Sequence, residues 1–351
     1  MAFIKVEKVA IRGISGCAPK NVEENIDMPF YSSKEEAEQV IAATGIVRRH
    51  ITTAEQTASD ICLNAAEVLL EELGWKKESI DLIAFATQDP DYLNHPNSFI
   101  VHDSMGLSDN CICLDFYHGC PAWVVSLSSV TSMMQSGMIK RALLLDGDTA
   151  SKLQDKMGRE ERPLFGDAGT ATALEYDENA TPLYFNIGTL SEGGKALIRP
   201  NGGSRNPYTI ESLKTELDRR KGLIPIEQGR MDSMDVFSFA ITKVPKALKK
   251  LCAEYELNID EISNLYLHQA NKLIIDNIAK RMKVDSIKVP LSLSEFGNTT
   301  SASVPLTIAF NNEGKKDVCE KILACGFGTG LAWGVVYFET HNMVCPKISF
   351  I

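Results

Sequence analysis

The sequence predicts an α/β fold in which two related halves are fused in one chain. The first observation is length, because 351 residues exceed the size at which one hydrophobic core keeps growing. The second is a weak internal repeat. The third is the alternation of apolar strand patterns with helical patterns, which is typical of crossover units on a mostly parallel sheet. We expect an N-terminal half over residues 1–176 and a C-terminal half over residues 177–351.

The internal repeat consists of three pairs of blocks that share one register. Two pairs are apolar strands: Ser79–Gln88 resembles Glu261–Gln269, with the two glutamines 181 residues apart, and Arg141–Asp148 resembles Lys321–Gly328 at an offset of 180. At the same offset, Asp115–Cys120 falls on Glu295–Thr300. Chance similarity explains any one pair of apolar strands. Three pairs at offsets of 180 to 181 favour a duplication.

Four segments have apolar residues at helical spacing: Ala58–Leu73, Pro121–Ser136, Phe237–Tyr255 and Ala270–Met282. With the strand patterns between them, each half alternates strands and helices. If a pseudo-twofold axis relates the halves, equivalent loops meet near that axis. We therefore expect the turn at Cys120 to face the turn at Asn298.

Cys120 lies between a short apolar strand and a helix that begins at Pro121. Proline suits the first helical position because its missing N–H would have no partner there. The helix dipole and the free N–H groups lower the pKa of a thiol at this position and stabilise a thiolate. Cys120 is therefore a candidate nucleophile, although a cysteine among apolar residues is often an inert packing residue.

His268 follows the apolar strand pattern Asn264–Leu267 and precedes a helix. Ligands of open α/β sheets bind at the carboxyl ends of strands, which is where this histidine falls. A single histidine after a strand is often only structural. The duplication favours a functional role, because it brings His268, Cys120 and Asn298 to one place.

The composition excludes several other classes of protein. A net charge of −10 argues against a nucleic-acid-binding protein, whose surface is basic. No run approaches the roughly 20 apolar residues that span a bilayer, and charges interrupt the N-terminus too early for a signal peptide. The nine cysteines show no metal-binding spacing beyond Cys111-x-Cys113. We expect a cytoplasmic protein with no metal centre and no membrane insertion.

Several motifs resemble those of the β-ketoacyl-ACP synthase III family of thiolase-like condensing enzymes. They cover nearly the whole chain: Thr44-Gly-Ile46, the turn at Cys120, Phe165–Gly169, His268-Gln-Ala-Asn271, Gly297–Pro305 and Gly326–Gly334. The glycines of the last motif lack the spacing and the strand–helix context of a dinucleotide site. The resemblance implies a five-layered αβαβα sandwich of two duplicated halves, usually a homodimer, that works without a cofactor.

The resemblance also implies a catalytic triad of Cys120, His268 and Asn298. In such a site the thiolate attacks an acyl thioester at little energetic cost, because one thioester replaces another. Decarboxylation of a malonyl thioester then builds negative charge on the thioester oxygen. A His N–H and an Asn amide aimed at that oxygen stabilise the enolate by ~3–4 kcal/mol per donor.

Further site residues follow from the same resemblance. The backbone N–H groups of Cys120 and Thr329 are the expected oxyanion donors, and Thr329 stands where the family usually has glycine. Phe165, Asn271 and Gly328 are expected at the substrate pocket, although Asn271 is better suited to orienting the loop of His268. His118, where the family has small residues, is either a surface-facing bystander or a modifier of the thiol pKa.

The implied reaction is a decarboxylative Claisen condensation of an acyl group on Cys120 with a malonyl thioester, expected to be malonyl-ACP. Polyketide and quinolone starter enzymes and non-decarboxylating acyltransferases use the same residues, and the sequence does not separate these. The order Cys120, His268, Asn298 also matches a papain-type hydrolase, but its Cys-Gly-Ser-Cys-Trp motif is missing and the duplication would be unexplained. A non-catalytic scaffold is disfavoured because the triad is complete.

An acidic acyl carrier protein is the partner that the resemblance implies. Since this chain is itself acidic, docking needs a local basic patch. The candidates after His268 are Lys272, Lys280, Arg281 and Lys283, with Lys246, Lys249 and Lys250 on the preceding helix. An ordinary solvated helix face explains any one of them equally well.

Family members that start from an acyl-CoA usually hold the adenine between a Trp and an Arg just before the Thr-Gly-Ile motif. The matching positions here are Gln39 and Ala43, which cannot stack on a purine. Losing ~1–3 kcal/mol of stacking weakens CoA binding roughly ten- to a hundred-fold. We therefore expect acyl-ACP to be preferred as the donor, unless Arg48 or Arg49 reaches a phosphate.

Two segments are longer than is typical of the family, Leu197–Ser233 and the tail His341–Ile351. Either one could shape the substrate mouth or be a solvated surface loop.

Overall fold

A computed structural model describes residues 2–154, 158–210, 215–218, 222–225 and 230–351. The first of its two large sheets has eight strands in the order β15-β18-β2-β8-β7-β5-β6, with β19 beside β2. Their bounds are β2 Val9–Ala18, β5 Leu82–Thr87, β6 Ile112–Tyr117, β7 Arg141–Asp148, β8 Ala168–Tyr176, β15 Lys315–Val318, β18 Met343–Cys345 and β19 Ser349–Phe350.

The second large sheet has five strands in the order β1-β9-β17-β16-β14. Their bounds are β1 Ala2–Val6, β9 Leu183–Thr189, β14 Asn264–Leu267, β16 Lys321–Gly328 and β17 Ala332–Glu339. The strands of the predicted repeat occupy matching places, since β5 and β7 are parallel neighbours in one sheet and β14 and β16 are parallel neighbours in the other.

This correspondence extends to four strands in each sheet. The neighbours β2, β8, β7 and β5 match β9, β17, β16 and β14, and in both sets the first two pairs are antiparallel and the third is parallel. The strands near each end of the chain join the sheet that is formed mainly by the other half. The N-terminal strand β1 belongs to the second sheet, and the C-terminal strands β15, β18 and β19 belong to the first. The division of the chain between residues 176 and 177 stays a prediction.

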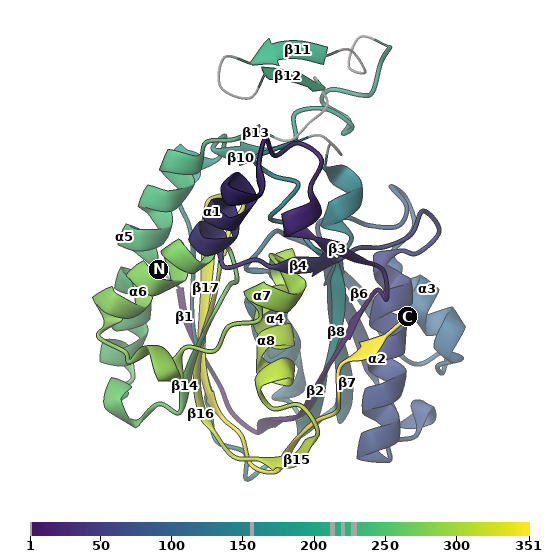
Figure 1. Cartoon of the computed structure of the whole chain (residues 1–351). Coiled ribbons are helices and arrows are strands. Elements are labelled where there is room, and N and C mark those ends of the chain that lie inside the picture. Colours follow the sequence, from purple (N-terminus) through teal and green to yellow (C-terminus); the bar gives the residue numbers. More distant parts are fainter. Residues whose placement is uncertain (1, 155–157, 211–214, 219–221, 226–229) are drawn as a thin grey trace.

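Helices form the other three layers, as Figure 1 shows. α4 (Ala122–Met134) and α8 (Ser303–Asn311) lie between the two sheets and contact strands of both. α2 (Ala58–Leu73) and α3 (Asn97–Met105) cover the outer face of the first sheet, and α5 (Ser233–Glu254) and α6 (Lys272–Met282) cover that of the second. The predicted five-layered αβαβα sandwich is confirmed.

Local signals in the sequence set the ends of these helices. α2 has the predicted bounds, with a capping box between Thr57 and Asp60 at its start and Gly74 in a left-handed conformation at its end. α5 begins four residues before the predicted start because the Asp232 side chain accepts hydrogen bonds from two N–H groups of its first turn. α6 begins two residues after the predicted start because Asn271 is its N-cap.

The alternation of side chains along the buried strands separates three cores. In β5, Leu82 and Ala84 belong to the central core around α4 and α8, whereas Ile83 and Phe85 belong to the outer core beneath α2 and α3. A third core lies between the second sheet and α5 and α6. Strands buried on both faces consist almost entirely of apolar residues, which is why the repeat was visible in the sequence.

The remaining α-helices and strands are α1 Lys34–Thr44, α7 Leu293–Phe296, β3 Val22–Glu24, β4 Arg48–His50, β10 Leu197–Ile198, β11 Thr215–Asp218, β12 Gly222–Pro225 and β13 Arg230–Met231. The long segment Leu197–Ser233 contains β10 to β13, and its residues 211–214, 219–221 and 226–229 lie outside the described residues. Across the described ranges, no helix is both long and apolar enough to cross a membrane.

Candidate active site

Cys120 lies in the turn between β6 and α4, at the carboxyl end of the first sheet, and is only 6% exposed. The end of β16 from the second sheet lies across from it. A Cβ added to Gly328 would be 2.5 Å from Cys120 Sγ, so only a glycine lets this backbone approach the sulfur. Both sheets therefore build the surroundings of the thiol.

Burial raises the pKa of the Cys120 thiol above its ordinary value, and the charge of Asp148 raises it further. The polar groups of Thr329 and the backbone of Cys120 itself act in the opposite direction and favour a lower pKa. The prediction of a lowered pKa is therefore wrong. It took account of the helix N-terminus but not of the distant loop that covers the thiol.

His268 follows β14 at the carboxyl end of the second sheet and is 2% exposed. Its backbone N–H donates to the carbonyl of Cys325 (2.9 Å), and its ring packs edge-on against Phe327, with the ring centroids 5.3 Å apart. Phe327 precedes Gly328, so the same end of β16 contacts both His268 and Cys120.

The His268 ring is held in a neutral state. Nδ1 lies 2.7 Å from Ser303 Oγ at the start of α8, and burial lowers the pKa of His268 to about 4. A neutral imidazole carries one N–H donor and one acceptor nitrogen. It can therefore donate a hydrogen bond at neutral pH without carrying a charge.

Asn298 lies in the loop between α7 and α8 and is 6% exposed. Its backbone N–H donates to the carbonyl of Leu164 (2.8 Å), and its side-chain Oδ1 accepts from the backbone N–H of Thr300 (3.0 Å). Because the acceptor side of the amide is used in this bond, the NH₂ side is the one that can donate to a substrate oxygen.

Thr300 has a strained backbone, with φ at 51° in the left-handed region that a β-branched residue rarely adopts. Besides the bond from its N–H to Asn298, its hydroxyl donates to Asp148 and its backbone hydrogen-bonds the His268 ring. Thr300 therefore connects Asn298, His268 and Asp148 in one network.

Two contacts across the centre are related by the repeat. Cys120 and Thr300 are 180 residues apart, as are Asp148 and Gly328. Cys120 contacts Gly328, and the equivalent Thr300 contacts Asp148. The turns that carry Cys120 and Asn298 thus meet through the ends of β7 and β16, which agrees with the expectation from the duplication.

Asp148, at the end of β7, was not among the predicted site residues. It is fully buried and accepts hydrogen bonds from the Thr87 hydroxyl (2.7 Å), the Gln88 N–H (2.9 Å) and the Ser301 hydroxyl (2.9 Å). The repeat contained the signal, because it matches Asp148 with Gly328 in the final position of equivalent strands.

The other predicted residues around the triad occupy different places. Phe165 pairs with Asn298 through a parallel bridge, so it lies beside the triad. Asn271 caps α6, with Oδ1 accepting from the Ile274 N–H at 2.8 Å, as suits a residue that orients the loop of His268. His118 is half-buried rather than surface-facing, and burial lowers its pKa.

The expected docking residues lie on the outer layer next to the site. Lys280 and Arg281 are exposed in the last turn of α6, whereas Lys272 in the first turn pairs with Asp276. Lys246, Lys249 and Lys250 are exposed on α5, which packs against α6.

Gln39 and Ala43, the two positions expected to face an adenine, are exposed on α1. Arg48 is paired with Glu24 and Glu295. Arg49 is fully buried and paired with Glu23, so it cannot reach a nucleotide phosphate at the surface.

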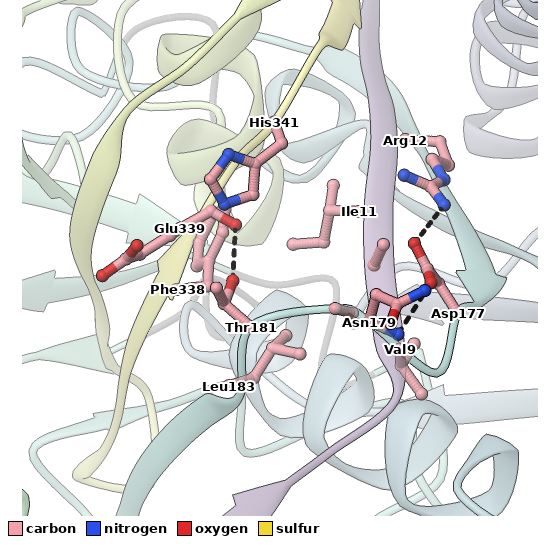
Figure 2. A pocket seen from close by; sticks show the side chains of 12 residues that line it. Val9, Ile11, Arg12, Asp177, Asn179, Thr181, Leu183, Phe338, Glu339 and His341 are labelled. Atoms are coloured by element: carbon pink, nitrogen blue, oxygen red, sulfur yellow. Dashed lines mark hydrogen bonds and ion pairs between the residues drawn. The ribbon is translucent and has the colours of Figure 1, made fainter.

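Figure 2 shows a cavity of about 220 Å³ that is separate from this site. Its lining includes Glu339, which lies opposite Lys321 in the register of β17 and β16. Lys321 is the first residue of β16 and lies about 23 Å along this strand from Gly328, its last residue. The Arg12 guanidinium in this cavity is already paired with Glu175 and Asp177. Among the described residues, no three His, Cys, Asp or Glu side chains are grouped to hold a metal.

Comparison with known proteins identifies relatives of the whole chain. The family model "3-Oxoacyl-[acyl-carrier-protein (ACP)] synthase III" matches residues 114–191, and the model of its C-terminal part matches residues 252–340. The β-ketoacyl-[acyl-carrier-protein] synthase III of Fusobacterium nucleatum is 31% identical over 94% of this chain and 98% of its own length.

Solved structures agree with this assignment. The crystal structure of a 3-oxoacyl-(acyl-carrier protein) synthase from Burkholderia xenovorans is 30% identical, covers 99% of both chains and superposes with a TM-score of 0.91. A priming β-ketosynthase from the R1128 polyketide pathway covers 97% of this chain and 98% of its own with a TM-score of 0.83. Its identity of 22% shows a shared fold only.

Proposed function

Since this chain belongs to the β-ketoacyl-ACP synthase III family of thiolase-like condensing enzymes, we propose that it joins an acyl group held on Cys120 to a malonyl thioester by decarboxylative Claisen condensation. The observation that carries the proposal is the convergence of Cys120, His268 and Asn298 on the ends of β7 and β16. Fatty-acid initiation or a specialised acyl pathway is the proposed setting.

In the first step Cys120 Sγ attacks the carbonyl carbon of an acyl thioester. The C–S bond of the donor breaks, the donor leaves as a thiol that takes up the Cys120 proton, and a new thioester forms on the enzyme. The backbone N–H groups of Cys120 and Thr329 are the proposed donors to the oxyanion of this step and of the later condensation. The contact of Thr329 with the Gly119 position supports the placement of this loop beside the Cys120 turn.

In the second step a malonyl thioester loses CO₂, and the electron pair of the broken C–C bond forms an enolate. We assign stabilisation of the enolate oxygen to a His268 N–H and the Asn298 amide. The neutral state of His268 supports this role, because in the tautomer whose Nδ1 accepts from Ser303 the ring N–H is on Nε2, which is then a donor. The enolate carbon then attacks the acyl carbonyl, and Sγ leaves as the thiolate.

Intact-mass measurement tests the first step. Incubation with a short acyl-ACP should add one acyl group to the protein, absent from Cys120→Ala and retained by the buried-cysteine control Cys62→Ala. Adding malonyl-ACP should release the acyl group as β-ketoacyl-ACP with one CO₂. Acylation that persists in Cys120→Ala would overturn the proposal, and acyl release without CO₂ would favour a non-decarboxylating acyltransferase.

We also propose that acyl-ACP is preferred over acyl-CoA as the donor. Gln39 and Ala43 offer no aromatic or guanidinium plane to an adenine, and Arg49 is buried. Single-turnover acylation of Cys120 by the same acyl group on ACP and on CoA tests this preference. Faster loading from CoA at equal concentration would contradict it.

A homodimer is proposed from the edge of the first sheet. β6 is the edge strand, and Ile112 and Tyr117 on it are 40% and 80% exposed, with Tyr92 and Leu93 nearby 64% and 93% exposed. An exposed edge strand with apolar side chains favours pairing with a second copy. Sedimentation velocity should give a dimer, and a monomer at micromolar concentration would contradict it.

A cytoplasmic location is proposed because all nine cysteines are free thiols.

A further inference from the structure

Two buried carboxyl groups, those of Asp146 and Asp148, form a pair on β7 (the carboxyl pair). Ala142 and Leu144 of this strand belong to the central core, so the alternation of side chains places Asp146 and Asp148 on the same face. Both residues are fully buried. Asp148 contacts Thr300, but Asp146 has no role in the proposed mechanism. Two carboxyl groups buried in one place require compensating hydrogen bonds.

The hydroxyl of Ser301, just before α8, connects the two carboxyl groups. Ser301 Oγ lies 2.5 Å from Asp146 Oδ1 and 2.9 Å from Asp148 Oδ2. Both distances are those of O–H···O hydrogen bonds, which measure roughly 2.5–3.0 Å. A hydroxyl has only one hydrogen to donate. It therefore supplies one of these two bonds, and the hydrogen of the other must come from a carboxyl group.

The partners of the two carboxyl groups show which one carries this hydrogen. Besides the bond from Ser301, the Asp148 carboxyl accepts hydrogen bonds from three donors: the Thr87 hydroxyl, the Gln88 N–H and the Thr300 hydroxyl. Among the described residues, Asp146 Oδ1 contacts Ser301, and Asp146 Oδ2 has no hydrogen-bond partner. Donors stabilise the ionised form of a carboxyl group. Asp148 is therefore the carboxylate, and Asp146 is the carboxylic acid that donates to Ser301.

Three other titratable groups act on the carboxyl pair: Cys62 on α2, Asp89 after β5 and Cys120 before α4. Each of them is negative when ionised, so none stabilises a charge on Asp146. The positive charge of Arg199 acts on Asp89. Burial and the neighbouring carboxylate raise the pKa of Asp146 well above its ordinary value, in agreement with the count of hydrogens.

The internal repeat supports the contact between β7 and this loop. At the offset of 180, Asp146 and Ser301 are equivalent to Gly326 and Pro121. A Cβ added to Gly326 would be 2.8 Å from Pro121 Cα, so the equivalent positions of the other half are also in contact. There the two backbones meet directly because Gly326 has no side chain. In this half a hydrogen bond between Asp146 and Ser301 replaces that contact.

We propose that Asp146 is a positioning residue whose un-ionised carboxyl donates a hydrogen bond to Ser301, so that Ser301 donates in turn to an ionised Asp148. Asp148 also accepts from the Thr300 hydroxyl, and the Thr300 N–H donates to Asn298 Oδ1. The proton on Asp146 thus helps to hold the loop that carries Asn298. This consequence for catalysis rests on the proposed function, whereas the location of the proton does not.

The pH dependence of stability tests the proton on Asp146 without any substrate. An aspartate in the unfolded chain ionises at about pH 4, so at pH 5 and above the unfolded state has released the proton that the folded protein keeps. Unfolding therefore becomes more favourable as the pH rises. Asp146→Asn keeps the shape and a donor but cannot titrate. From pH 5 to pH 7, the urea-unfolding equilibrium constant of the wild type should rise about 100-fold relative to that of Asp146→Asn.

Asp109→Asn is the matched control, since Asp109 is exposed between α3 and β6. The unfolding constant of the wild type relative to that of this control should stay the same between pH 5 and pH 7. A ratio for Asp146→Asn that is equally constant would overturn the proposal. If Asp146→Asn does not fold, Asp146→Ala also lacks the titrating group and should show the same change of about 100-fold.

Release of CO₂ from malonyl-ACP tests the positioning role. Asp146→Ala and Ser301→Ala each break the connection to the loop, so both should release CO₂ roughly ten- to a hundred-fold more slowly, with a smaller effect on acylation of Cys120. Asp146→Asn restores a donor to Ser301 and should recover the rate that Asp146→Ala loses. Equal rates for these two variants would overturn the positioning role. If the wild type itself releases no CO₂, the proposed function fails, and the unfolding measurement still decides where the proton lies.

Discussion

Gly328→Ala should disable the nucleophile while leaving most of the fold intact. The new Cβ would lie 2.5 Å from Cys120 Sγ and 2.9 Å from Cys120 Cβ. Rotating the thiol away cannot relieve the second contact, because the backbone of the turn fixes Cβ. Gly328 also has φ at 154°, where side chains other than hydrogen are strained. Either the end of β16 or the Cys120 turn must move.

The magnitude follows from these two effects. Backbone strain costs ~1–3 kcal/mol and overpacking ~1–3 kcal/mol, so we expect the free energy of unfolding to fall by roughly 2–6 kcal/mol. A displacement of about 1 Å at a reacting atom lowers a rate ~100-fold. Acylation of Cys120, followed by time-resolved intact-mass measurement, should therefore slow by about that factor.

Gly74→Ala is the matched control for this change. Gly74 ends α2 with φ at 62°, and a Cβ there would have no neighbour within 4 Å. The control should lose only ~1–2 kcal/mol from its left-handed backbone and should acylate at the wild-type rate. A folded Gly328→Ala protein that acylates as fast as Gly74→Ala would refute the contact between β16 and the thiol.

Three further predictions concern the histidine, the amide and the docking surface. Burial holds the pKa of His268 at about 4, below its ordinary 6.5. Between pH 6.5 and pH 4 the histidine is therefore protonated in the unfolded chain but neutral in the folded protein, so the free energy of unfolding decreases as the pH falls. On going from pH 7.5 to 5, urea unfolding of the wild type should therefore lose about 2 kcal/mol more stability than that of His268→Gln, and equal losses would count against a buried neutral imidazole. His268→Ala and Asn298→Ala should each lower malonyl decarboxylation ~10²–10³-fold, as measured by CO₂ release, with a smaller effect on acylation of Cys120; the opposite pattern would reverse the assigned roles. Lys280→Glu and Arg281→Glu should raise the KM for carrier-bound substrate and leave the KM of small thioester mimics unchanged, and equal changes in both would reject docking at α6.

The sequence predicted those features that depend on periodicity and on the repeat. Strands buried on both faces are continuous apolar runs, so the blocks that became β5, β7, β14 and β16 could be aligned at one offset. The alignment also places Cys120 opposite Thr300. Helix ends were predicted well where a capping box or glycine marks them, as at α2, and less well where a capping side chain lay outside the periodic run, as at Asp232.

The direction of the Cys120 pKa shift could not be predicted in the same way. The local signal, a thiol at the start of a helix, favours ionisation. The opposing effects come from Asp148 and from burial beneath residues 328 and 329, which lie some 200 positions further along the chain. Periodicity indicates which elements form but not how deeply one atom is covered. The net direction of the Cys120 pKa shift, which depends on both the helix N-terminus and the burial of the thiol, is therefore evident only from the three-dimensional structure.

Thr300 shows that equivalent positions of the two halves can have different roles in one site. The first half places a nucleophile, Cys120, against Gly328, where the absence of a side chain leaves the sulfur room. The second half places Thr300 at the equivalent position, where its hydroxyl bonds Asp148 and its strained backbone presents an N–H to Asn298 Oδ1. Strain of ~1–3 kcal/mol persists only where several contacts hold it, and Asp148, Asn298 and His268 all contact Thr300. One copy of the repeated turn thus carries the reacting atom, and the other holds the two proposed enolate-stabilising side chains in position.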